Sequence, residues 1–147
     1  MKKFILALAF VMFASVSAQD QKPDIFLAHD IFMSRYNALR VYVNPQDSHG
    51  AVMYLNNLKN EMQSCLSSCD ISEEYTQAVI ALINSNIAFL DGLMLIRQSP
   101  NYDRLTTEDR MRILQEAILF LISRYDAFNV VCEKYNLKKI DRYSGRF

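Results

Sequence analysis

The apolar positions of this chain recur every three or four residues in four successive segments, which is the pattern of amphipathic α-helices. The spacing predicts helices over about residues 24–43, 51–69, 72–98 and 107–137. Prolines interrupt the pattern between the first two helices and before the last one, because a residue that precedes proline is disfavoured in the helical region. Four long helices with short connections pack most simply as an antiparallel up-down four-helix bundle. We therefore expect an all-α fold.

The predicted helices differ in how much of their surface is apolar. The last helix has one unbroken seam with four-three spacing, formed by Met111, Leu114, Ile118, Leu121, Tyr125, Phe128, Cys132 and Tyr135. Helix 72–98 is apolar nearly all the way round from Ala78 to Ile96, and its few polar interruptions are Asn84, Ser85, Asn86 and Asp91. Its length allows a membrane span, but these polar residues favour a central helix. Such a helix is buried on several sides, or packs against a second copy in a homodimer.

The N-terminal segment indicates where the protein works. A positive start, Met1-Lys2-Lys3, precedes an apolar run from Phe4 to Ala14, and Val16-Ser17-Ala18 then places small residues where a signal peptidase cleaves. The run is too short for a membrane span, which takes about 20 residues. We expect residues 1–18 to be a cleaved secretory signal. Residues 19–147 would then form a single helical domain with a short basic C-terminal tail, in the periplasm of a bacterium or secreted from it.

Charge and motif content argue against nucleic-acid binding and against catalysis. Removal of residues 1–18 leaves 14 basic and 16 acidic residues, so the chain lacks the cationic excess that a nucleic-acid-binding face needs. No nucleophile elbow, phosphate-binding glycine loop or His-Glu-x-x-His motif is found in the sequence. We expect neither enzymatic activity nor a cofactor, and no nucleic-acid partner.

The three cysteines form the one site-like group in the sequence. In an up-down bundle, Cys65 and Cys69 of the second helix lie at the same end as Cys132 of the fourth helix. A disulfide from Cys65 or Cys69 to Cys132 would suit an exported protein and could add on the order of 4 kcal/mol in the chain-entropy model. Three reduced buried thiols and a metal site are the alternatives. A link between Cys65 and Cys69 has poor geometry, since they are one helical turn apart.

Two His-x-x-x-Met pairs occur, His29 with Met33 and His49 with Met53. Imidazole and thioether ligands together suit copper. Methionine is frequent here, however, so such pairs arise by chance. We expect His29 at the edge of the first helix and His49 in a solvated turn within residues 44–50.

Partner-contact residues are predicted in two places. The loop 97–107 carries Arg97, Tyr102 and Arg104, and tyrosine and arginine are frequent interface hot spots. The basic tail carries Lys138 and Arg142, which would suit an acidic partner or weak contact with an anionic membrane surface, although cations also suit a helix C-terminus.

Taken together, these features favour an exported small helical protein that binds another protein, such as an immunity-type inhibitor or an accessory part of an envelope machine. The alternatives are a metal-binding bundle that uses the cysteines and a periplasmic chaperone.

Overall fold

The computed structural model describes residues 24–42 and 48–141, and this part of the chain is all-helical. Its elements are α2 (Ile25–Tyr42), α3 (Ser48–Ser67), α4 (Glu73–Gln98), the short 3₁₀ helix η1 (Tyr102–Arg104) and α5 (Thr107–Lys134). The predicted all-α class is therefore confirmed, with four long helices within the described residues. The predicted signal segment 1–18 and the candidate contact residue Arg142 lie outside the described residues.

The start of α3 differs from the prediction. The helix begins at Ser48, so His49 and Gly50 belong to its first turn rather than to a loop. Ser48 and Ala51 are both buried. Packing of this turn against the rest of the protein outweighs the weak helical preference of a His-Gly pair, as tertiary contacts often do.

The end of α5 also differs from the prediction. The helix ends at Lys134, three residues earlier than expected, because Asn136 adopts a positive φ of 55°. The Leu137 amide then donates to the Cys132 carbonyl at 2.8 Å, and the Asn136 amide donates to the Glu133 carbonyl at 3.1 Å. These two bonds form a Schellman motif, and the buried side chains of Leu137 and Cys132 supply its apolar contact. The motif turns the chain back at the end of α5.

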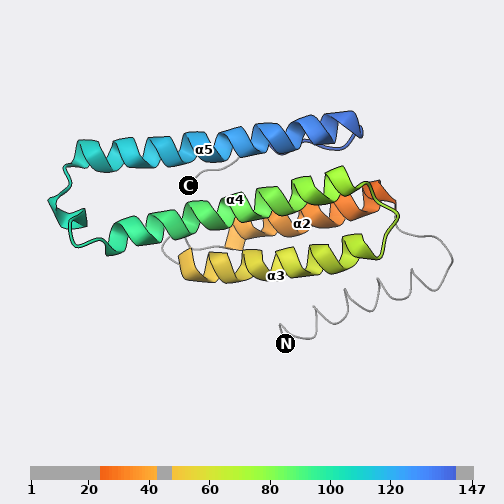
Figure 1. Ribbon diagram of the computed structural model, residues 1–147, viewed down its shortest axis with the longest axis horizontal. Coiled ribbons are helices and arrows are strands. Elements are labelled where there is room, and N and C mark those ends of the chain that lie inside the picture. The colour runs from red at the N-terminus through yellow and green to blue at the C-terminus, as the bar shows by residue number, and fades with distance from the viewer. Residues whose placement is uncertain (1–23, 43–47, 142–147) are drawn as a thin grey trace.

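Consecutive helices run in opposite directions, and α4 lies between α5 on one side and α2 and α3 on the other (Figure 1). Backbone contacts join α2 to α3, α3 to α4 and α4 to α5. At the end where η1 connects them, α4 and α5 continue past α2 and α3 (Figure 1). The two-helix projection formed by the end of α4, η1 and the start of α5, residues 90–118, is called the hairpin end below.

Aromatic side chains bridge α2 to α4 and α5. The Phe32 ring meets the Phe128 ring edge-on, with centroids 5.6 Å apart, and also contacts Tyr36 at 5.4 Å. Tyr75 of α4 lies 6.5 Å from Phe128 in the same group. All four rings are buried, and side chains of this size account for much of the apolar area of a core. The core therefore lies at the end opposite the hairpin end and in the middle of the molecule.

Candidate functional site

The seam of α5 is buried along only half of its length. Leu121, Tyr125, Phe128 and Cys132 are all buried, as the unbroken pattern predicts. Earlier on the same seam, however, Leu114 is 38 % exposed and Met111 is 52 % exposed. The exposed half belongs to the hairpin end, which α2 and α3 do not reach (Figure 1). A seam with core spacing is thus left open to solvent.

The corresponding part of α4 is also poorly covered. Tyr75, Val79, Leu82, Ile83, Asn86 and Phe89 are the buried residues of this helix, and none of its side chains after Phe89 is fully buried. Leu95 is 69 % exposed. A Cβ placed on Gly92 would meet nothing within 4 Å, so this glycine does not serve a close backbone approach. The last turns of α4, residues 90–98, are therefore not enclosed by the described residues, and packing of this helix against a second copy stays a prediction.

The loop at the hairpin end has a defined conformation. Tyr102 donates its amide to the Ser99 carbonyl at 2.9 Å, and the Arg104 amide bonds the Asn101 carbonyl at 3.0 Å. The Arg110 guanidinium lies 4.5 Å from the Tyr102 ring centroid and donates to the Tyr102 carbonyl at 3.0 Å. This cation–π contact and hydrogen bond fix the tyrosine against the first turns of α5.

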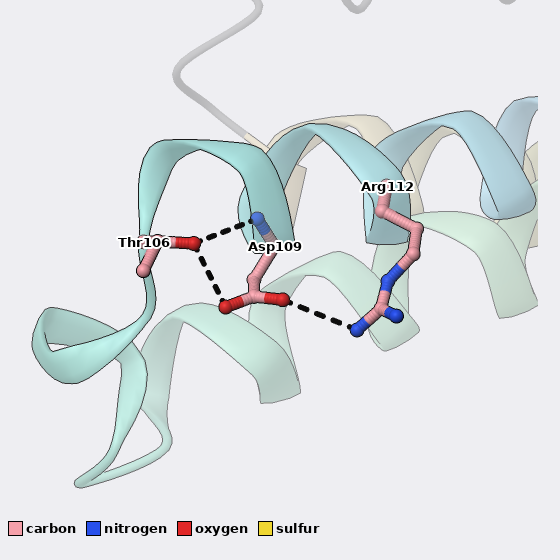
Figure 2. A network of polar contacts seen from close by, with 3 residues as sticks. All are labelled: Thr106, Asp109 and Arg112. Atoms are coloured by element: carbon pink, nitrogen blue, oxygen red, sulfur yellow. Dashed lines mark hydrogen bonds and ion pairs between the residues drawn. The ribbon is translucent and has the colours of Figure 1, made fainter.

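A side-chain cap holds the start of α5. The Thr106 hydroxyl accepts from the Asp109 amide at 3.1 Å and donates to the Asp109 carboxylate at 2.8 Å (Figure 2). The other carboxylate oxygen accepts from Arg112 at 3.2 Å. Thr106 is therefore the N-cap of α5. Ser72, at the N-cap position of α4, makes no side-chain cap, and its hydroxyl lies 2.6 Å from the Tyr135 hydroxyl.

The structure places the predicted contact residues in different settings. Arg97 and Arg104 are exposed, and neither guanidinium makes an ion pair among the described residues. Tyr102, between them, is half-buried under Arg110. Lys138 is far away at the other end of the molecule, where its side chain is exposed and its carbonyl is bonded to His29. Arg97, Tyr102 and Arg104 thus belong to the hairpin end, and Lys138 does not.

The cysteines are all free thiols in this structure, so the expected disulfide is not formed. Cys132 is buried and Cys65 and Cys69 are half-buried, with the Cys69 thiol bonded to the Cys65 carbonyl at 2.9 Å. Burial raises the pKa of Cys65 to about 11, with a further contribution from Cys69, and burial raises the pKa of Cys132 to about 11. Both groups are protonated at neutral pH and are weak nucleophiles. The described residues contain no group of three His, Cys, Asp or Glu side chains that could hold a metal.

His29 is buried, with 1 % of its surface exposed, and the expectation that it lies at a helix edge is wrong. Its Nε2 lies 2.7 Å from the Lys138 carbonyl oxygen, and its Nδ1 lies 3.0 Å from the Tyr75 hydroxyl. A carbonyl oxygen only accepts, so Nε2 carries the hydrogen and Nδ1 accepts from Tyr75. Burial lowers the pKa of His29, against the opposing effects of the Lys138 bond and of Asp30. Both ring nitrogens are occupied, which leaves neither one free to bind copper with Met33.

A second buried polar group lies in the middle of the molecule. Asn86 accepts hydrogen bonds from the Tyr36 hydroxyl at 3.0 Å and from the Tyr125 hydroxyl at 3.4 Å, and it donates to the Leu82 carbonyl at 2.9 Å. In the sequence pattern, Asn86 stands only as an interruption of an apolar face. The signal that could have found it is positional, because Asn86 is one α-helical turn from Leu82 and Leu90, on the inner side of α4.

The segment after α5, residues 136–141, folds back along the helix and is called the C-terminal strap below. Asn129 of α5 bonds Ile140 twice, accepting from its amide at 2.8 Å and donating to its carbonyl at 3.0 Å. Leu137 and Ile140 of the strap are buried. An exposed ion pair of 3.2 Å between Lys139 and Glu133 lies beside them. The strap thus closes the end of the molecule that holds His29, Tyr75 and Cys132.

Among the described residues, α4 is the one helix long and apolar enough to cross a membrane, with a mean hydropathy of 1.9 over its most apolar window. Helices in the core of soluble proteins have the same length and hydropathy. Comparisons of the chain with protein-family models, curated proteins and solved structures find no match in any of the three.

Proposed function

We propose that this chain is an exported small helical protein that binds another folded protein through its hairpin end. The observation that carries the proposal is the divided seam of α5, on which Met111 and Leu114 keep core spacing but remain exposed. Exposed apolar side chains that lie next to each other on a seam with core spacing mark a candidate interaction site. Export rests on the positive, apolar and small-residue pattern of residues 1–18.

The scaffold in this proposal is an antiparallel up-down four-helix bundle. The alternating directions of the helices and the contacts of α3 with α4 and of α4 with α5 support it. In such a scaffold the shorter α2 and α3 bury one half of the long α4–α5 pair and leave the other half available. The fold can then be stable without the hairpin end being covered.

Charge and rigidity at the hairpin end support a protein partner. Arg97 and Arg104 present guanidinium groups that have no ion pair within the described residues, and Leu95, on the same helix as Arg97, is exposed. The packing of Arg110 on Tyr102 and the Thr106 cap hold this loop before a partner arrives. A preformed loop loses less conformational entropy on binding, which favours affinity. Full burial of a Leu or Met side chain contributes about 1.5–3 kcal/mol more.

Site-specific photo-crosslinking in the source cells tests the proposal. A crosslinker at position 97 or 104 should give one discrete crosslinked product. Its mass should differ clearly from the mass of two copies of this chain. The matched control is a crosslinker at Gln63, an exposed position on α3 far along the chain from the loop, which should give no such product. The product should disappear when Met111 and Leu114 are both replaced by Ser. A product with the mass of a homodimer, or equal products from position 63, would contradict the proposal.

A further inference from the structure

At one end of the molecule, the titratable ring of His29 contacts the C-terminal strap. Few other contacts hold the strap to the helices. The C-terminal strap is held by the Lys138 carbonyl on His29, by the two bonds between Asn129 and Ile140, and by the burial of Leu137 and Ile140. His29 also bonds Tyr75 of α4, so a single side chain of α2 ties the strap to the core. We propose that the strap is a pH-sensitive latch, closed by neutral His29 and released when His29 takes up a proton.

The hydrogen-bond pattern around the ring is complete when the ring is neutral. With the Nε2 hydrogen directed at the Lys138 carbonyl, Nδ1 must accept, and the Tyr75 hydroxyl is placed to donate to it. A protonated ring carries a hydrogen on Nδ1 as well, so the Tyr75 oxygen would have to accept and direct its own hydrogen elsewhere. The thiols of Cys65 and Cys132 are close enough to raise the pKa of Tyr75, but thiol sulfur is a weak acceptor.

The surroundings of the ring do not solvate a positive charge. His29 stacks on Phe128 with an interplanar angle of 18° and meets Tyr75 edge-on, and its side chain is almost fully enclosed. Burial of an imidazolium in such a site is costly unless water reaches it. Of the elements around the ring, the strap is the shortest, and displacing it admits water with the least loss of packing. Protonation therefore favours the open latch.

The charged and titratable groups around the His29–Tyr75 pair come from each neighbouring element. They are Asp30 on α2, Cys65 on α3, Tyr75 on α4, Cys132 on α5 and Lys139 on the strap. Asp30 favours a proton on His29, whereas Lys139 carries a positive charge on the strap itself. The cysteines and Tyr75 stay neutral across the acidic range, because burial raises their pKa values. His29 is thus the group here that a fall in pH below neutrality is expected to charge once the ring is hydrated.

The sign of the effect follows from linkage. Folding lowers the pKa of His29, so the ring binds a proton more readily once the latch is open and the ring is hydrated. Acid therefore shifts the equilibrium toward the open strap, by up to about tenfold for each pH unit between the ordinary pKa of about 6.5 and the lowered value. Release would expose Leu137 and Ile140 and uncover Cys132.

Hydrogen exchange of the purified chain at pH 7.5 and 5.5, corrected for intrinsic exchange rates, tests the latch. Protection of the Leu137 and Ile140 amides should fall severalfold to tenfold at pH 5.5, while the α4 amides keep their protection. The matched control is His49→Asn, which removes the exposed histidine and should leave the response unchanged. His29→Gln keeps an N–H group for the Lys138 carbonyl but cannot be charged, so its strap should not respond to pH.

A measurement on the unmodified chain keeps the test decisive if His29→Gln does not fold. The NMR titration midpoint of the His29 ring should coincide with the midpoint of strap opening. Strap protection that is constant from pH 7.5 to 5.5, a response that follows His49, a response that persists in folded His29→Gln, or a loss of α4 protection at the same midpoint would each overturn the proposal. The last of these would mean that the whole molecule unfolds rather than the strap alone.

Discussion

The His29 imidazole donates a hydrogen bond to the backbone carbonyl of Lys138, a residue 109 positions later in the chain, at 2.7 Å. This single bond joins the first described helix to the last described segment. It also requires the Nε2–H tautomer of His29, which in turn directs the Tyr75 hydroxyl toward Nδ1. A residue type that often marks a metal site or a catalytic base serves here to hold the C-terminal strap.

The free thiols give a prediction about reactivity. Alkylation of the folded protein at pH 8 should modify half-exposed Cys69 first and Cys65 slowly, and Cys132 should react only when denaturant is added. After denaturation without a reductant, all three cysteines should be alkylated, and the intact mass of the protein measures this. A mass lower by two hydrogens with a single alkylated cysteine would show a disulfide and contradict this arrangement.

The same thiols predict an alkaline loss of stability. Cys65 and Cys132 have pKa values near 9.0 when unperturbed and about 11 in the folded protein. The unfolded chain therefore releases these protons first, so the contribution of the two thiols to the free energy of unfolding should be constant well below pH 9 and fall as the pH rises through 9 toward 11. Urea unfolding from pH 8 to 11 measures it. Replacement of Cys132 by Ala should reduce the pH dependence, and an unchanged slope would contradict the assignment.

The Asn86 group is expected to stabilise the middle of the core. Asn86→Ala removes an acceptor that Tyr36 and Tyr125 share and should lower the free energy of unfolding by about 1–2 kcal/mol from lost hydrogen bonds, although the two hydroxyls keep their bond to each other at 3.0 Å. The control is Asn84→Ala, since Asn84 is exposed and bonds only Lys59 at 3.3 Å. That change should have an effect below about 0.5 kcal/mol. Equal effects of the two changes would show that the buried bonds add nothing to stability.

The Thr106 cap gives a prediction at the hairpin end. Thr106→Ala should destabilise the protein by about 1 kcal/mol, because the Asp109 amide loses its acceptor. Thr107→Ala is the matched control, because Thr107 is the next residue, is exposed and does not cap the helix. Chemical denaturation of the two variants side by side measures the difference. If Thr107→Ala costs as much as Thr106→Ala, the cap is not the source of the loss.

Sequence reasoning found the parts of this molecule that depend on local spacing. The four helices follow from apolar residues three and four positions apart. His29 and Asn86 were not identified as buried polar residues, because their partners Tyr75, Lys138, Tyr36 and Tyr125 are distant in the chain.

The sequence also does not predict that one half of the α5 seam is buried and the other half exposed, because this depends on helices that are distant in the chain. Met111 and Leu121 have the same spacing and apolar character, so the sequence alone assigns both to the core. What separates them is the reach of α2 and α3, which depends on how helices of different length pack together (Figure 1). The pattern identifies an apolar face, and the neighbouring helices decide how much of that face is covered.

Unfolding of two variants on the same seam, Leu114→Ala and Leu121→Ala, tests the divided seam most directly. Leu121 is 2 % exposed, so its truncation should lower the free energy of unfolding by about 2–5 kcal/mol. Leu114 is 38 % exposed at the hairpin end, so its truncation should cost about 1 kcal/mol or less at protein concentrations where no partner is present. That contrast would support a seam whose buried half stabilises the fold and whose exposed half is available for binding. Equal, large losses would contradict it, because Leu114 would then belong to the core.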